Sequence, residues 1–280
     1  MKALLATRVS QNKEPIRVLV RHSEQIQPML DLGIQEVMVG DLRSPEVLEQ
    51  AARGIRAIYH IPPNVNPDEV RIGQGLIQAA SSAGVEHFVY HSVLHPQTEA
   101  MPHHWQKLRV EELLFTSGLN FTVLQPTVYM QNVLAQWDQI LNHDVYRVPY
   151  AASTRLGMVD LEDVAAAAAV VLLENAHQGA IYELCGPDVL SQDEVASILE
   201  QVTGRPVRVE IQSRQLWEQR ARASGLGEYQ VNTLLKMFEY YEQNGFWGNP
   251  HVLGWLLNRQ PGSFKAFIER VCSSVNAHSQ

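Results

Sequence analysis

The chain has 280 residues, of which 45% are hydrophobic and 19% are charged, which is ordinary for a globular protein. Its formal net charge is -8 and it has no cluster of Lys and Arg, so we expect no nucleic-acid partner. The most apolar run, residues 164–173, is far shorter than the ~20 residues of a membrane span, so we expect no membrane partner. Two distant cysteines and the lack of a signal-peptide pattern indicate a cytoplasmic protein.

Strand and helix patterns alternate in the first half of the chain. Apolar, β-branched runs predict strands at residues 16–21, 36–41, 57–61, 87–92 and 121–124. Helical patterns lie between them, and Ser44 followed by Pro45 is typical of a helix start. Gly73 and Gly75 lie inside one of these helices, where each costs ~1 kcal/mol relative to Ala. Strands separated by helices predict parallel βαβ units in a doubly wound α/β sheet.

The second half of the chain has a more mixed pattern. A helix is expected at residues 164–173 and a strand at 180–184, and Ser191 with Glu194 forms a capping box before another helix. Residues 213–271 have a helical pattern with breaks. We therefore expect a sheet-bearing region in residues 1–155. A small, mostly helical C-terminal lobe on the substrate side, interleaved with the sheet, is expected in residues 156–280.

The start of the chain lacks the glycine-rich turn of a nucleotide-binding βαβ unit. That turn brings backbone N–H groups to a pyrophosphate, but the first glycine here is Gly33. Residues 1–15 are either strand one with a loop, or the tail of the first helix before strand two. Parallel neighbours need a crossover of about a dozen residues, so we favour the second interpretation. The first strand and its loop are then absent, through a misplaced start codon or a natural truncation, and an upstream in-frame stop codon would exclude the former.

From residue 16 onward, the chain resembles the NmrA-like family of atypical short-chain dehydrogenases/reductases. The order and spacing of several motifs carry this resemblance, which covers nearly the whole chain. The motifs are residues 17–21, 39–42, 87–94, 102–107, 125–132 and 247–250. The resemblance implies a Rossmann-like, NAD(P)-binding fold. The chain departs from the family pattern in its missing glycine motif and in Gln125, where the family usually has arginine.

The family resemblance implies two kinds of function and leaves open whether the chain is an enzyme. One is an NADP(H)-dependent oxidoreductase acting on a small carbonyl, quinone or aromatic substrate. The other is a noncatalytic, NADP-sensing regulator that acts through a protein partner. Without its phosphate loop the chain is expected to bind NADP weakly, and a third hypothesis is a truncated form that binds no nucleotide. Unpaired sheet edges would then favour a homo-oligomer.

His103 and Lys107 are the candidate catalytic pair. Residues four apart share one face of a helix, and short-chain dehydrogenases use Tyr-x-x-x-Lys, in which Lys lowers the pKa of the proton donor and holds the nicotinamide ribose. A histidine in the tyrosine position can donate a proton near neutral pH, since its ordinary pKa is ~6.5. The alternative is a solvated helix start. His104 replaces His103 if the helix register differs.

Ser92 and Tyr129 are further candidates. Ser92 ends a strand, where open α/β sheets bind ligands, and its hydroxyl could hydrogen-bond a substrate carbonyl. The alternative is an ordinary loop serine. Tyr129 follows the next strand and either lines the same crevice or packs in the core.

Arg21, Asp41 and Pro62 are the remaining candidate cofactor-binding residues. A basic residue after the second strand can meet the 2′-phosphate of NADP, whereas an acidic one favours NAD. The alternative for Arg21 is a surface side chain. By resemblance, Asp41 is expected near the adenine and Pro62 near the crevice.

The evenly spaced His87, His91 and His95 do not indicate a metal site. On a strand, residues four apart are separated by ~13 Å and cannot share an ion, so no metal is expected. Asp160 and Asp163 have the pattern of an acidic first turn of a helix, which is a structural role.

Overall fold

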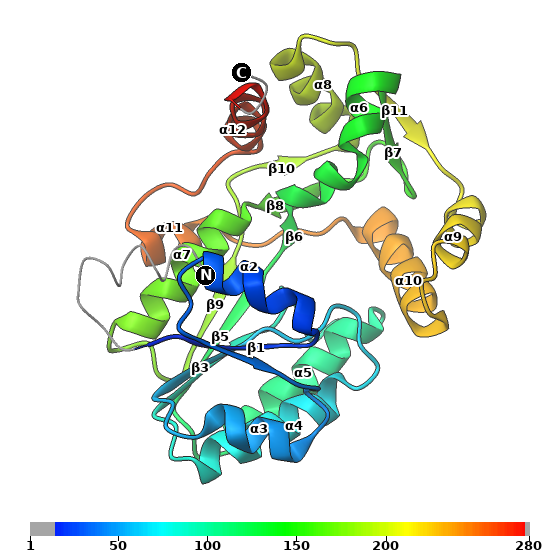
Figure 1. Ribbon diagram of the computed structural model, residues 1–280. Helices are drawn as coiled ribbons and strands as arrows, with labels where there is room; N and C mark the ends of the chain where they lie inside the picture. The colour runs from blue at the N-terminus through cyan, green and yellow to red at the C-terminus, as the bar shows by residue number, and fades with distance from the viewer. Residues whose placement is uncertain (1–14, 278–280) are drawn as a thin grey trace. The chain divides into compact units, whose positions relative to one another are not determined.

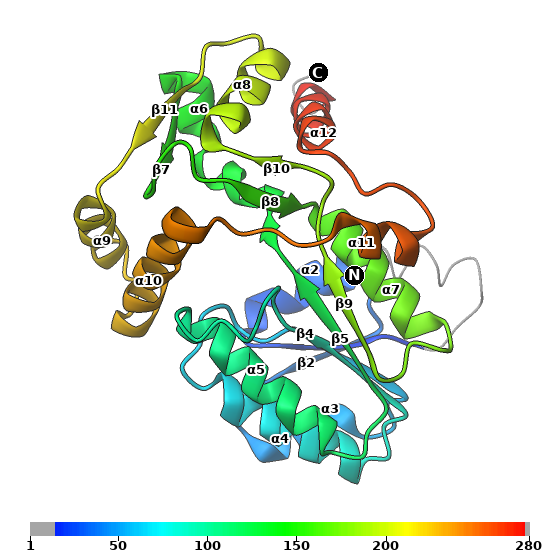
Figure 2. The same cartoon turned by 180° about the vertical axis from the view of Figure 1, so that it is seen from behind.

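The computed structural model describes residues 15–277, which divide into two compact units (Figures 1 and 2). The first unit contains residues 15–92 together with Gln106–Leu124 and Ala165–Ile181. The second contains Val93–Trp105, Gln125–Val164 and the chain from Tyr182 onward. Each unit is assembled from segments that are far apart in the sequence, and the domain boundary at residue 155 stays a prediction.

The first unit contains two sheets built from the predicted strands. Strands β1 (Arg17–Val20) and β2 (Glu36–Val39) form a parallel pair. The other sheet has the order β3-β4-β5-β9, formed by Ala57–His60, His87–His91, Phe121–Pro126 and Ala180–Leu184. Strands β3, β4 and β5 are parallel. The α/β fold class with parallel sheets is thus confirmed.

The pairing of β1 agrees with its interpretation as strand two. In a doubly wound sheet of order 3-2-1-4, strand one has strands two and four as neighbours. Among the described strands, β1 pairs with β2 and with no strand of the β3-β4-β5-β9 sheet, so it lacks the second neighbour of a strand one. The prediction for the preceding residues falls on 1–14, which lie outside the described part of the chain.

Helices α3 (Pro45–Ala52), α4 (Glu69–Ser82) and α5 (Pro102–Phe115) lie side by side against the first unit's strands (Figure 2). The other helices that lie wholly or mostly in the first unit are the 3-10 helix η1 (Ser23–Gln25), α2 (Ile26–Asp31) and α7 (Leu161–Leu173). The predicted cap is confirmed, because the Ser44 hydroxyl accepts the backbone N–H of Val47. Phe88 on β4, which is fully buried, packs with the apolar faces of these helices.

Close packing explains the two glycines inside α4. A Cβ at Gly73 would lie 2.8 Å from both Cγ atoms of Val110 on α5. A Cβ at Gly75 would lie 3.2 Å from Cδ1 of Leu48 on α3. These glycines therefore allow α4 to approach its neighbours, which offsets their intrinsic cost to the helix.

The second unit combines short strands with most of the C-terminal helices. Its strands form the sheets β10-β8-β6 and β11-β7. They are β6 (Val128–Tyr129), β7 (Val145–Val148), β8 (Leu156–Val159), β10 (Val189–Leu190) and β11 (Arg208–Ile211). The helices are η2 (Met130–Gln136), α6 (Trp137–His143), α8 (Gln192–Thr203), α9 (Arg214–Ala223), α10 (Glu228–Asn244), α11 (Pro250–Leu257) and α12 (Phe264–Ala277).

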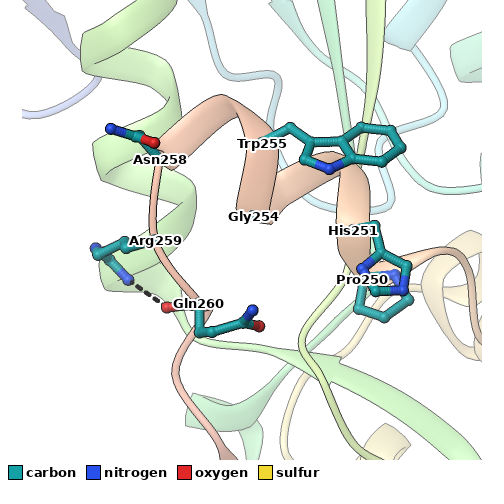
Figure 3. A pocket seen from close by; sticks show the side chains of 7 residues that line it. All are labelled: Pro250, His251, Gly254, Trp255, Asn258, Arg259 and Gln260. Carbon is teal, nitrogen blue, oxygen red and sulfur yellow. Dashed lines mark hydrogen bonds between the residues drawn. The ribbon is translucent and has the colours of Figure 1, made fainter.

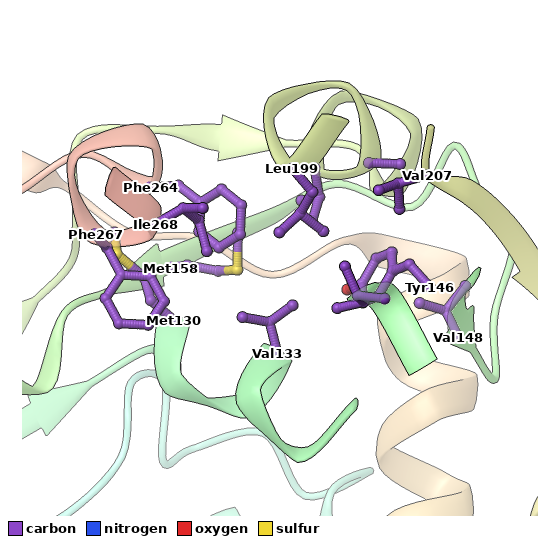
Figure 4. Packing of buried hydrophobic residues seen from close by; sticks show 13 residues of the cluster. Met130, Val133, Tyr146, Val148, Met158, Leu199, Val207, Phe264, Phe267 and Ile268 are labelled. Atoms are coloured by element: carbon purple, nitrogen blue, oxygen red, sulfur yellow. The ribbon is translucent and has the colours of Figure 1, made fainter. Parts of the chain in front are cut away.

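A core of methionine, aliphatic and aromatic side chains holds this unit together (Figure 4). Met158 from β8, Leu199 from α8 and Phe264 from α12 belong to the same buried cluster. The capping box that opens α8 is confirmed, since Ser191 and Glu194 each accept the other's backbone N–H. No described helix has both the length and the apolar composition that crossing a bilayer requires.

Asp160 and Asp163 have the structural role that the sequence indicates. Asp160 accepts the N–H of Glu162 at the start of α7 and pairs with Arg270 at 2.5 Å. Burial alone would raise the pKa of Asp160, but these bonds lower it below its ordinary value. Asp163 pairs with Arg259 at 2.5 Å. Both carboxylates therefore tie the start of α7 to the C-terminal segment.

Candidate functional site

The carboxyl ends of strands β1 to β4 carry most of the predicted site residues. Arg21 follows β1, Asp41 follows β2 after one glycine, Pro62 follows β3 by one residue and Ser92 follows β4 directly. Ligands of open α/β proteins bind at this end of the strands. We call this end of the first unit the carboxyl edge.

Lys107 lies in a buried polar cluster at the carboxyl edge. Its Nζ is 3.0 Å from Oε1 of Glu69, and the two side chains are only 13% and 3% exposed. The Tyr90 hydroxyl donates to the same Glu69 oxygen at 2.8 Å, and the Lys107 amine lies 5.6 Å from the centroid of the Tyr90 ring. Lys107 Nζ also lies 3.5 Å from the His91 carbonyl oxygen. The amine is thus held from several sides.

Burial sets the protonation of the groups around this lysine. It lowers the pKa of Lys107, whereas the carboxylates of Glu69 and Glu111 raise it. Burial, reinforced by the charge of Lys107, lowers the pKa of His60 and of His91 to about 3. Both imidazoles are therefore neutral at physiological pH. His91 makes a 2.6 Å hydrogen bond with the Tyr59 hydroxyl through Nδ1.

Ser92 is buried at the end of β4, and its hydroxyl donates a short hydrogen bond to Oε1 of Glu111. Side chains two residues apart point to the same face of a strand, so Ser92 follows Tyr90 toward the helices. The serine lies at the predicted position, but its hydroxyl proton is held by a carboxylate.

Two arginines and an aspartate form an exposed cluster at the end of the β1–β2 pair. The Arg43 guanidinium bonds the Asp41 carboxylate at 2.8 Å, and Arg43 also lies 3.6 Å from Asp68. The Arg43 side chain and backbone, helped by the charges of Arg43 and Arg21, lower the pKa of Asp41 to about 2. Because Val20 and Val39 are paired in register, the residues after them lie together. This end of the sheet therefore carries two cations.

The other predicted residues lie in different surroundings. Pro62 is buried after β3. His103 lies one helical turn before Lys107 in α5, which begins at Pro102. His104 is fully buried, with its Nδ1 3.2 Å from the His95 carbonyl oxygen, so its ring packs in the core of the second unit. Tyr129 lies on β6 in the second unit, where burial raises its pKa to about 12.

His87 and His91 occupy opposite ends of β4 and have different partners. His87 Nε2 lies 2.9 Å from the Thr122 hydroxyl, whereas His91 meets Tyr59. Within residues 15–277, no group of three or more His, Cys, Asp or Glu side chains is arranged to hold a metal ion.

A surface pocket of about 500 Å³ lies on α11 and the loop after it, and none of the predicted site residues lines it (Figure 3). Its Trp255 is 75% exposed and stacks on His251. Its Arg259 is already paired with Asp163. The pocket therefore offers an aromatic surface and no pair of reactive groups.

Sequence reasoning missed Glu69, Glu111 and Arg43. Glu111 had a signal, because it lies four residues after Lys107 on the same helix face. Arg43 follows Asp41 by two residues, and the loop conformation that joins them has no periodic pattern. Glu69 is 38 residues from Lys107, so only the folded chain brings them together.

The residues at the carboxyl edge fit NADP in part. The buried, cationic Lys107 can donate to ribose hydroxyl groups, and the two arginines after β1 and β2 can pair with a ribose phosphate. The backbone cradle for a pyrophosphate, which normally precedes β1 in this topology, does not lie among the described residues.

Comparisons with known proteins agree with this geometry. The sequence profile of the NmrA-like family matches residues 2–278. The chain is 33% identical over 201 residues to the NAD(P)H azoreductase of Xenophilus azovorans, covering 70% of this chain and 68% of that relative. It is 29% identical over 192 residues to quinone oxidoreductase 2 of Escherichia coli (strain K12), covering 69% and 66%.

Solved structures support the same fold. The crystal structure of the NADPH-dependent quinone oxidoreductase from Escherichia coli, complexed with NADPH, superposes with a TM-score of 0.82. The match covers 96% of this chain and 95% of that one, at 23% sequence identity. At this identity, the likeness shows that the folds are the same.

Proposed function

Because the chain belongs to the NmrA-like family, whose relatives here are NAD(P)-binding oxidoreductases, we propose that it is an NADP(H)-dependent oxidoreductase acting on a small carbonyl, quinone or aromatic substrate. The observation that carries this proposal is the buried, ion-paired Lys107 at the carboxyl edge. Two relatives, an azoreductase and a quinone oxidoreductase, support a substrate with a conjugated, electron-accepting group.

The exposed cluster after β1 and β2 favours NADP over NAD. Arg21 and Arg43 follow β1 and β2 and carry two guanidinium groups near Asp41, at the end of the strands where dinucleotides bind in this fold. Arginine pairs well with phosphate through parallel N–H donors. Asp41, the acidic residue that could bind a ribose hydroxyl, is already held by Arg43.

Each remaining candidate has a role in this proposal. Lys107 holds the nicotinamide ribose, His103 or a water supplies the proton, Ser92 positions the substrate carbonyl and Pro62 lies beside the crevice. The role of Tyr129 in lining a crevice stays a prediction. Asp41 lies near the adenine. When bound, the reduced cofactor supplies the hydride. Because His91 and His60 are neutral, their imidazole rings add no positive charge that would repel the Lys107 ammonium group.

We expect the binding of NADPH to this chain to be weak. The described residues supply contacts for the ribose phosphate and the nicotinamide ribose but not the backbone cradle for the pyrophosphate. A submicromolar dissociation constant for the chain as given would contradict this expectation.

Titration of the purified protein with NADPH and NADH, followed by fluorescence or calorimetry, tests the proposal. We expect NADPH to bind more tightly than NADH, Lys107→Ala to weaken binding and Lys236→Ala, an exposed control on α10, to leave it unchanged. Oxidation of NADPH that depends on a quinone, azo dye or aldehyde would support the enzyme. Equal binding by both lysine variants would contradict the role of Lys107.

A noncatalytic, NADP-sensing regulator with a protein partner is the second candidate. The observation that favours it is the Ser92 hydroxyl, whose proton is held by Glu111 and is not offered to a substrate. Tight NADPH binding without turnover across the substrate panel would support this candidate. No binding of NADPH or NADH in this titration would contradict both candidates.

A further inference from the structure

Glu69 is the buried acidic residue that forms an ion pair with Lys107, and the proposed oxidoreductase reaction gives it no role. It opens α4, is 3% exposed and accepts two hydrogen bonds on one oxygen. Oε1 receives the Lys107 amine at 3.0 Å and the Tyr90 hydroxyl at 2.8 Å. Three elements, α4, β4 and α5, thus converge on one carboxylate oxygen.

This arrangement is costly for the fold. Removing a carboxylate and an ammonium group from water has a desolvation penalty that their attraction often does no more than offset. An apolar pair would serve packing equally well, so stability alone does not explain a buried charge pair at the ligand-binding end of the strands. The pair does fix one position for a long side chain that is otherwise flexible.

We propose that Glu69 is the positioning residue for Lys107: its carboxylate holds the lysine amine at the carboxyl edge and keeps it charged, so that it can bind the ribose of the dinucleotide. Tyr90 completes the arrangement by donating to the same oxygen. The inference rests on the proposed function only for the identity of the ligand.

The groups that face Lys107 determine how its charge depends on pH. Glu69 from α4 and Glu111 from its own helix α5 raise its pKa. His60 from β3 and His91 from β4 are neutral near pH 7 and add no opposing charge. Burial opposes the two carboxylates. Glu69→Gln should therefore lower the pKa of Lys107.

NMR of lysine-labelled protein measures this directly without cofactor, because the chain has five lysines and few signals overlap. Lys107→Met assigns the signal of Lys107. We expect its titration midpoint in Glu69→Gln to lie below that of the wild type, and the midpoint in Glu69→Asp, which keeps the charge, to lie between the two. Glu86→Gln, an exposed change of the same type just after α4, is the matched control.

An unchanged Lys107 midpoint in Glu69→Gln, or an equal change in Glu86→Gln, would overturn the proposal. If Glu69→Gln does not fold, Glu69→Asp remains informative: a midpoint identical to that of the wild type would also count against Glu69.

NADPH titration provides the second readout. In Glu69→Gln we expect the dissociation constant to rise about tenfold or more near pH 9, the size of effect typical of a lost contact to a charged group. Near pH 6 the lysine regains its proton, and the loss should be smaller. An equal loss of NADPH affinity at pH 9 and pH 6 would show that Glu69 has only a structural role. If the wild type binds no NADPH, the proposed function fails. The NMR titration of Lys107, which needs no cofactor, then still tests whether Glu69 raises the pKa of Lys107.

Discussion

The two sheets of the first unit differ in how firmly their strands are held. In β4, all five residues are buried between paired neighbours, whereas β1 and β2 have mostly half-buried side chains and pair only with each other among the described strands. Their carboxyl ends differ in the same way. The four-stranded sheet ends in a buried cluster around Lys107, and the β1–β2 pair ends in an exposed one around Asp41.

This difference indicates that the two sheets have different roles in binding the cofactor. A buried charge cluster has a fixed geometry and strong interactions, which suit a group that must be placed accurately. Exposed ion pairs are weak and screened by salt, so their side chains can exchange an internal partner for a ligand phosphate. We infer that the four-stranded sheet positions the reactive end of the cofactor and the β1–β2 pair selects its phosphate.

The largest contrast should come from core truncation in the two sheets. Phe88→Ala empties a fully buried site on β4 and should lower the free energy of unfolding by about 3–5 kcal/mol. Leu19→Ala on half-buried β1 should cost about 1 kcal/mol. Urea unfolding of both variants measures the difference. Equal losses in the free energy of unfolding would contradict the claim that the four-stranded sheet is held more firmly than the β1–β2 pair.

Acid should destabilise the four-stranded sheet through His60 and His91. Their pKa values are about 3 in the folded protein, so between about pH 6.5 and 3 the unfolded chain binds protons that the folded chain does not. The stability that these neutral histidines supply is complete above pH ~6.5 and falls by at most about 1.4 kcal/mol per pH unit for each histidine as the pH drops.

Thermal unfolding across this pH range measures the slope. His60→Phe should reduce it, whereas His143→Phe, at an exposed position on α6, should not. An identical slope in wild type and His60→Phe would show that His60 does not carry this pH dependence.

The smallest effect on stability should come from the exposed cluster. Arg43→Ala removes an exposed ion pair, which water and salt screen and which contributes little to the free energy of unfolding. Its effect on binding should be selective, weakening NADPH more than NADH because only NADPH carries the 2′-phosphate. Calorimetric titration with both nucleotides measures the ratio, and equal weakening would remove Arg43 from phosphate recognition.

The strands of the first unit and its best-capped helices were predictable because each has a local signal. The apolar runs predicted the strands β1 to β5. Ser44 and Ser191 predicted helix starts that the structure confirms. The two-residue strands β6 and β10 could not be found, since two residues carry no periodicity. The second unit thus contains small sheets that its helical pattern did not indicate.

The candidate site was only half predictable. Lys107 and Ser92 have recognisable positions in the chain, but Glu69 was missed because it lies 38 residues from its partner Lys107. Glu111, which accepts the Ser92 hydroxyl, lies four residues after Lys107 and was missed although the helix spacing gave a signal. The sequence left the helix register of His103 and His104 open. The structure shows that His104 belongs to the core.

Hydrogen exchange of backbone amides, with and without NADPH, tests the central claim most directly. We predict that NADPH slows exchange in the segments after β1, β2 and β4, which carry Arg21, Asp41 and Ser92, and at the start of α5. No change should occur on α11 around Trp255. Protection confined to α11, or no protection at the carboxyl edge at a concentration of NADPH that saturates binding, would contradict the account.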